Sequence, residues 1–162
     1  MKNGIKAMSN IKKLFNKRLL VEIPEQYKEI EDKEDIFLGA NKPNYIFENK
    51  SLNSYITVTK SSLDITDSLE EILQALYNQY RRVIPNFKSS DLYLKKIETV
   101  EVGAFQYTST TSTRDLYNLV GLFAIDGKQT LMTMHCDIEN AIDEGSQFMK
   151  ILESIRVSQS SN

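Results

Sequence analysis

The alternation of apolar and polar positions is clearest between residues 117 and 136, where two strand-like runs flank Asp126-Gly127. A type I′ turn needs positive φ at both central residues, and an Asp-Gly pair accepts that conformation readily. The segment is therefore predicted to be a β-hairpin in which Ile125 pairs with Lys128. Because side chains alternate along a strand, this turn also assigns every residue of the hairpin to one of two faces.

The two predicted faces of the hairpin differ in character. The first, which we call the core face, carries Phe123, Met132 and Met134. We expect it to be buried beneath amphipathic helices. The second, which we call the mixed face, combines apolar and polar side chains: Val120, Leu122, Ala124, Asn118, Gln129, Leu131, Thr133 and His135. Such a face suits a second covering layer or a partner.

Shorter alternating segments predict further strands. They are Arg18–Pro24, Asp35–Ala40, Tyr45–Glu48, Tyr55–Lys60, Leu92–Ile97 and Val100–Thr110. In the fourth of these, Tyr55 and Thr57 alternate with apolar residues, which indicates an antiparallel strand with one apolar face. Residues 10–17 are expected to form one or two helical turns, and residues 25–35 a polar loop or a short helical turn.

Two segments have helical periodicity. Ser68–Arg82 carries apolar residues at a spacing of three and four, after Asp67, which is predicted to form a capping box with Glu70. A last helix is predicted to begin at the cap Asp137. Its apolar stripe comprises Ile138, Ile142, Gly145, Met149 and Leu152, widened by Phe148, Ile151 and Ile155. Close approach of this helix to the sheet would account for its glycine.

These elements predict an α+β fold in which an antiparallel β-sheet is flanked by helices. The length of 162 residues favours one domain, placed at residues 18–157. Residues 1–17 are expected to be a basic, partly disordered extension, and residues 158–162 a disordered tail.

Charge and composition exclude several classes of function. The formal net charge of −2 provides no basic footprint, so nucleic-acid binding is not expected. No run of about 20 apolar residues predicts a membrane span, and the basic N-terminal segment lacks the apolar stretch of a secretory signal. A single cysteine, Cys136, fits a reducing cytoplasm. A lone cysteine at the end of a strand is expected to be a small, buried apolar side chain.

The sequence predicts no catalytic site, metal site or cofactor. Its single histidine, His135, precedes Cys136, and adjacent strand residues point to opposite faces, so the two are not expected to form a dyad. No phosphate-binding or nucleophile motif occurs. Four acidic residues gather near the last helix: Asp137, Glu139, Asp143 and Glu144. The helix macrodipole explains acidic residues at that position.

A partner-binding site is predicted on the mixed face. Its residues are Tyr55, Thr57, Leu122, Leu131, Thr133 and His135. Tyrosine suits surfaces that bury an apolar ring while the hydroxyl stays in water. A peptide or a partner helix would lie on this face; in the alternative interpretation, the protein's own helix or loop covers it.

The order of these signals resembles the PsbP-like family, which includes Mog-type Ran-binding proteins and DcrB-like proteins. The segments that carry the resemblance lie within residues 18–157: Leu20–Pro24, Asn53–Thr59, Leu69–Leu76, Gly103–Tyr107, Asp126-Gly127 and Phe148–Val157. The resemblance implies an α/β/α sandwich and a role in binding instead of catalysis, with no catalytic residues to carry over.

The expected function is a non-enzymatic cytoplasmic module that binds another protein or an apolar helix, as an adaptor or chaperone. Two alternatives remain open on the sequence. An immunity protein that neutralises a toxin would have the same kind of fold, and a small enzyme would need its dispersed acidic residues brought together in a pocket.

Overall fold

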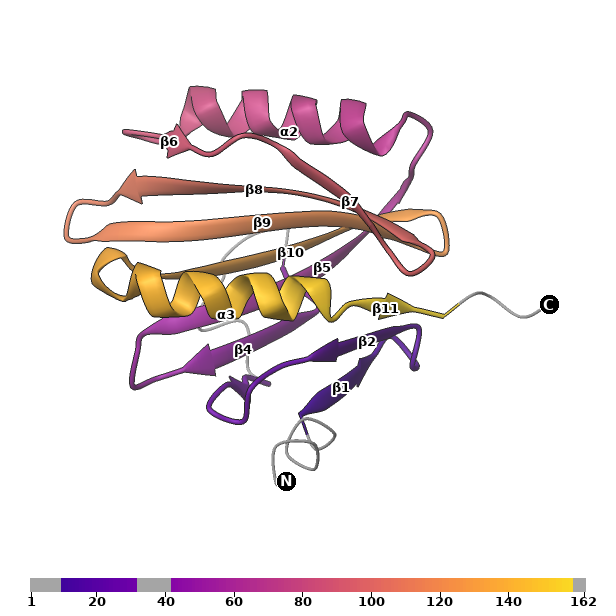
Figure 1. The fold of residues 1–162 in the computed structure, drawn as a ribbon, viewed down its shortest axis with the longest axis horizontal. Coiled ribbons are helices and arrows are strands. Elements are labelled where there is room, and N and C mark those ends of the chain that lie inside the picture. Colours follow the sequence, from indigo (N-terminus) through magenta and orange to yellow (C-terminus); the bar gives the residue numbers. More distant parts are fainter. Residues whose placement is uncertain (1–9, 32–41, 159–162) are drawn as a thin grey trace.

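The structure is a computed structural model that describes residues 10–31 and 42–158 (Figure 1). The predicted strand Asp35–Ala40, most of the N-terminal extension and all but Ser158 of the C-terminal tail lie outside the described residues. The remaining predicted strands and both helices are present. The fold is α+β, with mostly antiparallel sheets and helices on both sides, as the sequence predicts.

An eight-stranded antiparallel sheet has the order β3-β4-β5-β10-β9-β8-β6, and β7 also pairs with β8. Its strands are β3 (Lys28–Glu29), β4 (Tyr45–Asn49), β5 (Ser54–Asp64), β6 (Lys88–Ser89), β7 (Tyr93–Ile97), β8 (Val100–Thr110), β9 (Asp115–Ile125) and β10 (Lys128–Asp137). A small sheet comprises β1 (Ile11–Leu14), β2 (Leu19–Glu22) and β11 (Arg156–Val157). The helices are α2 (Leu69–Val83) and α3 (Ala141–Glu153), the latter preceded by the 3₁₀ turn η2 (Ile138–Asn140).

The hairpin of β9 and β10 lies at the centre of the large sheet and has the predicted register. Ile125 pairs with Lys128, and the pairing continues without a shift to the far end of the two strands. Asp126 and Gly127 have φ values of 51° and 75°, as a primed turn requires.

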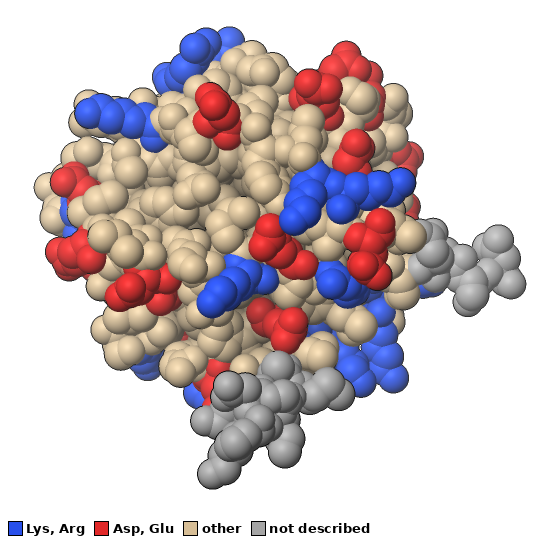
Figure 2. Space-filling model, in the orientation of Figure 1, with Lys and Arg blue, Asp and Glu red and all other residues tan. Residues whose placement is uncertain are grey.

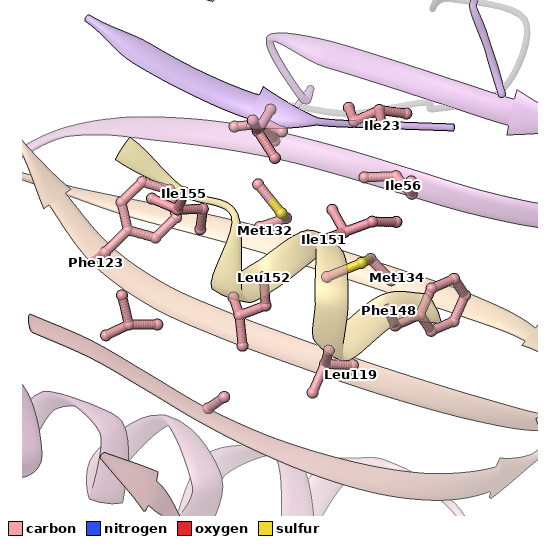
Figure 3. Close-up of a cluster of buried hydrophobic side chains, with 14 of the residues drawn as sticks. Ile23, Ile56, Leu119, Phe123, Met132, Met134, Phe148, Ile151, Leu152 and Ile155 are labelled. Atoms are coloured by element: carbon pink, nitrogen blue, oxygen red, sulfur yellow. The ribbon is translucent and has the colours of Figure 1, made fainter. Parts of the chain in front are cut away.

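The two helices pack on opposite faces of this sheet, which corrects the expectation that both lie over the core face. Helix α3 and the small sheet cover the core face, where Figure 3 shows Phe148, Ile151 and Leu152 of α3 beside Met132 and Met134 of β10. Helix α2 instead packs on the mixed face. Its buried residues Leu69 and Leu73 join Phe105, Val120 and Leu122 in a second apolar cluster.

Each helix lies close to the sheet at a position where a glycine leaves space. A Cβ atom at Gly103 of β8 would lie 2.9 Å from Leu73 of α2, so the absence of a side chain there admits the helix. Gly145 of α3 lies against the Tyr117 ring, where an added Cβ would lie 3.3 Å from the ring. The expected reason for a glycine inside the last helix is therefore confirmed.

Part of the predicted stripe on the last helix is wrong. Ile142 is 90% exposed and Ile138 is 39% exposed, whereas Phe148, Ile151 and Leu152 are buried. Ile138 lies in the 3₁₀ turn, outside the α-helical period. Ile142 lies inside α3 but on another side of the helix from Phe148 and Ile151, because residues six and nine positions apart do not share a helix face. Asp137 makes no side-chain capping bond there.

Two local predictions near the other elements are also corrected. Residues 11–14 form β1, paired with β2, where helical turns were expected. At α2 the cap lies one residue later than predicted, because Ser68 accepts a hydrogen bond from the Glu71 amide at 3.2 Å and its hydroxyl donates to the Glu71 carboxylate at 2.9 Å. The bond from the Glu71 amide to the Ser68 hydroxyl is that of a capping box shifted by one position, whereas the Glu71 carboxylate accepts from the same hydroxyl and not from the Ser68 amide.

Candidate functional site

Helix α2 covers the part of the mixed face that β8 and β9 form. Leu122 is fully buried in the cluster beneath this helix. It is therefore not accessible to a partner, which corrects its place among the predicted binding residues. The protein's own helix covers this half of the face, as the alternative interpretation proposed.

The other half of the mixed face is formed by β10 and β5 and is less deeply covered. Tyr55, Leu131, Thr133 and His135 are all partly exposed there. Thr57 is buried, at 6% exposed, and its hydroxyl shares a hydrogen bond with that of Thr133 on the neighbouring strand. The structure thus brings five of the six predicted residues together on two adjacent strands.

Strand pairing aligns polar and aromatic residues in a row that crosses five strands of the mixed face. Directly paired residues share a face, and the pairs run in sequence from β8 to β4. The members of this polar row are Tyr107, Asn118, His135, Tyr55 and Glu48. The sequence analysis placed three of them on the mixed face, Asn118, His135 and Tyr55, and counted the last two as binding residues. Tyr107 and Glu48 needed the pairings of β8 with β9 and of β4 with β5.

Tyr55 and His135 are in contact at the centre of the polar row. Their rings stack with centroids 5.2 Å apart and planes 23° apart. The Tyr55 hydroxyl donates to the Glu48 carboxylate at 2.7 Å, and this bond, with burial and the charge of Glu48, raises the pKa of Tyr55. Burial, followed by the charge of Arg114, lowers the pKa of His135, which favours the neutral ring.

Arg114 lies in the turn between β8 and β9, near the end of β10 that carries His135 and Asp137. Its Nε donates to the Asp137 carboxylate at 2.6 Å. Glu144, another member of the predicted acidic group, accepts a hydrogen bond from Tyr27 instead. These carboxylates therefore have different partners and do not converge as an acid–base pair.

A groove adjoins the polar row, between α2 and the strands β5 and β10. Its volume is about 580 Å³, within the range of about 300–1,000 Å³ that is usual for ligand sites. We call it the β5–β10 groove. It is lined by Lys42, Pro43, Thr57, Thr59, Lys60, Ser61, Ser62, Tyr80, Gln129, Leu131 and Thr133. Three of the predicted binding residues thus form part of its wall.

His135 and Cys136 lie on opposite faces, as predicted. His135 stacks on the mixed face, whereas Cys136 is fully buried in the core cluster beneath α3. Burial, with the charges of Glu144 and Asp137, raises the pKa of the Cys136 thiol to about 12. A thiol with this pKa is protonated at neutral pH and is a poor nucleophile.

In residues 10–31 and 42–158, no group of three or more His, Cys, Asp or Glu side chains is arranged to hold a metal ion. Over the same ranges, no helix is long and apolar enough to cross a membrane.

Comparison with known proteins shows the fold. No protein-family model matches the chain. The cyanobacterial PsbP protein (CyanoP) from Synechocystis sp. PCC 6803 is similar, with a TM-score of 0.69 and 9% identity over 91% of each chain. The Ran-binding protein Mog1p of Saccharomyces cerevisiae is also similar, with a TM-score of 0.58 and 10% identity over 91% of this chain and 95% of that one. The predicted resemblance to PsbP and Mog-type proteins is therefore confirmed for the fold.

A curated relative is matched over part of the chain. A stretch of 100 residues is 27% identical to the glutamyl-tRNA reductase of Thermosipho melanesiensis and covers 60% of this chain. It covers 27% of that protein, so the match spans less than a third of the relative's length.

Proposed function

We propose that this chain is a non-enzymatic protein-binding module whose partner contacts the less deeply covered half of the mixed face, formed by β5 and β10. The observation that carries the proposal is that the described residues, 10–31 and 42–158, cover this half of the face incompletely. Helix α2 buries Val120 and Leu122 but leaves Leu131, His135 and Tyr55 partly exposed beside a groove.

The chemistry of this surface suits a protein partner. Tyrosine and histidine rings offer apolar area with polar atoms at the edge, and Leu131 adds an aliphatic contact at the groove wall. The hydroxyls of Thr57 and Thr133, bonded to each other, lie beside it. Mog1p, which shares this fold, is described as a Ran-binding protein, so a fold of this kind serves protein recognition elsewhere.

The proposed role is that of an adaptor or chaperone acting in the cytoplasm. A fully buried, protonated thiol at Cys136 is compatible with a reducing compartment. An adaptor of this kind needs an accessible binding surface and no convergent catalytic groups. The separate partners of Asp137 and Glu144 agree with that requirement.

A photo-crosslinking experiment tests the proposal. A photoreactive phenylalanine analogue would replace Tyr55 in the native host, and a matched variant would carry it at Lys150, which is exposed on α3. We expect a discrete protein adduct at Tyr55 and none at Lys150. Direct titration of that protein should then show one-to-one binding that Leu131→Asp weakens by about tenfold or more.

Two results would contradict this function. One is an absence of any adduct at Tyr55; the other is equal affinity of the captured protein for the wild type and for Leu131→Asp. Thermal unfolding of the Leu131→Asp variant provides the folding control, because Leu131 is partly buried against the cluster beneath α2 and the affinities can be compared only if the variant stays folded.

A further inference from the structure

Strand β7 lies at the border of the large sheet and is paired along one edge. Its residues pair with β8 in antiparallel register, and β6 pairs with β8 further along the same border (Figure 1). Within the described residues, 10–31 and 42–158, no strand pairs with the other edge of β7. An open edge of this kind presents backbone groups that have no partner in the sheet.

The turn between β7 and β8 identifies the backbone groups that point toward the open edge. The turn Glu98-Thr99 joins Ile97 to Val100, and these two residues are paired. The closing pair of such a hairpin exchanges two backbone hydrogen bonds, and bonded pairs alternate with non-bonded pairs along the strands. The N–H and C=O groups of Leu94 and Lys96 therefore point away from β8.

One face of β7 offers an apolar and a basic side chain. Leu94 and Leu73 of α2 both lie against Gly103, so Leu94 is on the α2 side of the sheet, where it is 41% exposed. Lys96, two residues further on, shares this face and is exposed. Glu101 of β8 lies opposite Lys96, on the side away from the open edge. A strand added to β7 would meet Lys96 from its other side.

The opposite face of β7 is tied to α3. The Glu153 carboxylate accepts hydrogen bonds from the Lys95 ammonium at 3.3 Å and from the Tyr93 hydroxyl at 3.2 Å. Figure 2, drawn in the orientation of Figure 1, shows basic and acidic side chains next to one another over β7 and the end of α3. The charge of Lys95 is thus compensated, and selection among partners depends on Leu94 and Lys96.

The lysines of β7 restrict which strand is added at this edge. Two copies of this chain joined along β7 would bring the lysines of one strand close to those of the other, and like charges across strands are destabilising. A strand that places an acidic side chain beside Lys96 gains an attraction instead. Lysine at an edge therefore opposes self-association and still admits a complementary strand.

From these features we infer that the open edge of β7 accepts an extended segment of a partner polypeptide as an additional strand. The backbone of that segment would bond to the outward N–H and C=O groups of Leu94 and Lys96. An apolar side chain of the segment would lie beside Leu94, and an acidic side chain two residues away would lie beside Lys96. This surface is separate from the β5–β10 groove, so the inference goes beyond the proposed function.

A titration of the full-length, ¹⁵N-labelled protein with synthetic peptides tests the inference. The first peptide is a short run of alternating valine and threonine with leucine and glutamate two residues apart at its centre. In the second, lysine replaces the glutamate. We expect the first peptide to shift the amides of Leu94 and Lys96 and to slow their hydrogen exchange. The amides of Tyr93, Lys95 and Ile97, which already bond to β8, should keep their exchange rates.

Two controls remove backbone bonds and leave the rest of the contact in place. The first peptide, N-methylated at alternate residues along its bonding edge, lacks the N–H donors and should not bind. In the protein, Lys96→Pro removes an outward N–H and Lys96→Ala keeps it, so the proline variant should bind about tenfold more weakly than the alanine variant. Thermal unfolding of both variants shows whether they remain folded, and the N-methylated peptide tests the same bonds on the unchanged protein.

Charge is tested separately. The lysine-containing peptide should bind the unchanged protein about tenfold more weakly than the glutamate-containing peptide, and Lys96→Glu should reverse this preference. Lys150→Glu makes the same change on α3 and should leave the preference as it is.

Several results would overturn the inference. One is slow exchange of the Leu94 and Lys96 amides in the protein without peptide, which would show that the edge is already occupied. Others are undiminished binding of the N-methylated peptide, equal affinity for the two charged peptides, or shifts at Thr57 and Leu131 in place of β7. None of these results changes the outcome of crosslinking at Tyr55, which decides the proposed function independently.

Discussion

The two faces of the large sheet have different cover and, as a result, different character. On the core face, Met132, Met134 and Phe123 are fully buried beneath α3 and the small sheet. On the mixed face, α2 covers the β8–β9 half, and the β5–β10 half keeps partly exposed side chains. A sheet face becomes a dry core where the chain supplies a complete second layer, and side chains stay partly exposed where the described residues cover it less completely.

The aromatic residues illustrate the same contrast. Beneath α2, rings from the helix, from β8 and from the loop before β6 form a network of edge and tilted contacts: Tyr77, Tyr80, Phe87, Phe105 and Tyr107. On the core face, Tyr117 stacks on Phe148 in a smaller arrangement. Burial, followed by the interaction with Tyr80, strongly raises the pKa of Tyr107.

Removal of a core ring should have the largest effect. Phe148→Ala takes away a fully buried side chain beneath the sheet and should lower the free energy of unfolding by about 3–5 kcal/mol. Ile142→Ala, in the same helix but 90% exposed, should change it by less than about 0.5 kcal/mol. Urea denaturation measures both. Similar losses in the two variants would contradict the assignment of the buried side of α3.

Removal of one hydroxyl on each face should have a smaller effect. The buried Tyr27 hydroxyl lies 2.5 Å from the Glu144 carboxylate and 2.7 Å from the Ser54 hydroxyl. Tyr27→Phe should cost about 1–3 kcal/mol, because it leaves these groups without that partner. Tyr55→Phe, whose bond to Glu48 is half-exposed, should cost less than about 1 kcal/mol. Chemical denaturation measures both variants. A larger loss of unfolding free energy for Tyr55→Phe than for Tyr27→Phe would contradict this prediction.

Protonation of His135 should have the smallest effect. Tyr55, Asn118, Arg114 and Asp137 surround this ring; burial and the charge of Arg114 lower its pKa, and Asp137 opposes this shift. The unfolded chain therefore takes up the proton first. Stability should decline as the pH falls below the ordinary histidine value of 6.5, until the pH reaches the lower pKa of the folded state.

His135→Gln isolates this contribution, because the chain has no second histidine. Between about pH 7.5 and about pH 5.5, the unfolding free energy of the wild type should fall relative to that of the variant as the pH is lowered. A difference that is independent of pH would show that His135 titrates alike in the folded and unfolded chain.

Local signals account for much of what could be predicted. The turn at Asp126-Gly127 determines the register of β9 with β10, and through it the opposite placement of His135 and Cys136. The helical period predicted α2 within one residue at each end. Short segments were less predictable: the pattern of residues 11–14 becomes a strand because β2 is available to pair with it, and no local feature indicates that partner.

The candidate site was predictable in part. Strand alternation, which the sequence displays directly, places Tyr55 with Thr57 on one face of β5 and Leu131, Thr133 and His135 on one face of β10. The pairing of β5 with β10, which joins the two sets, is a tertiary feature. The burial of Leu122 was not predictable, because it depends on which face α2 occupies after the crossover from β5. The position of Tyr80 in the groove wall also depends on the face that α2 occupies.

The sequence by itself determined the longer elements, the central hairpin and the division of its side chains into two faces, since these depend on turn chemistry and on periods of two and 3.6. The tertiary structure decided how the faces are covered. It placed α2 and α3 on opposite sides, aligned Glu48, Tyr55, His135, Asn118 and Tyr107 in one row, and left a groove beside them. Those features depend on contacts between distant segments, and the geometry of such contacts follows from packing the whole chain.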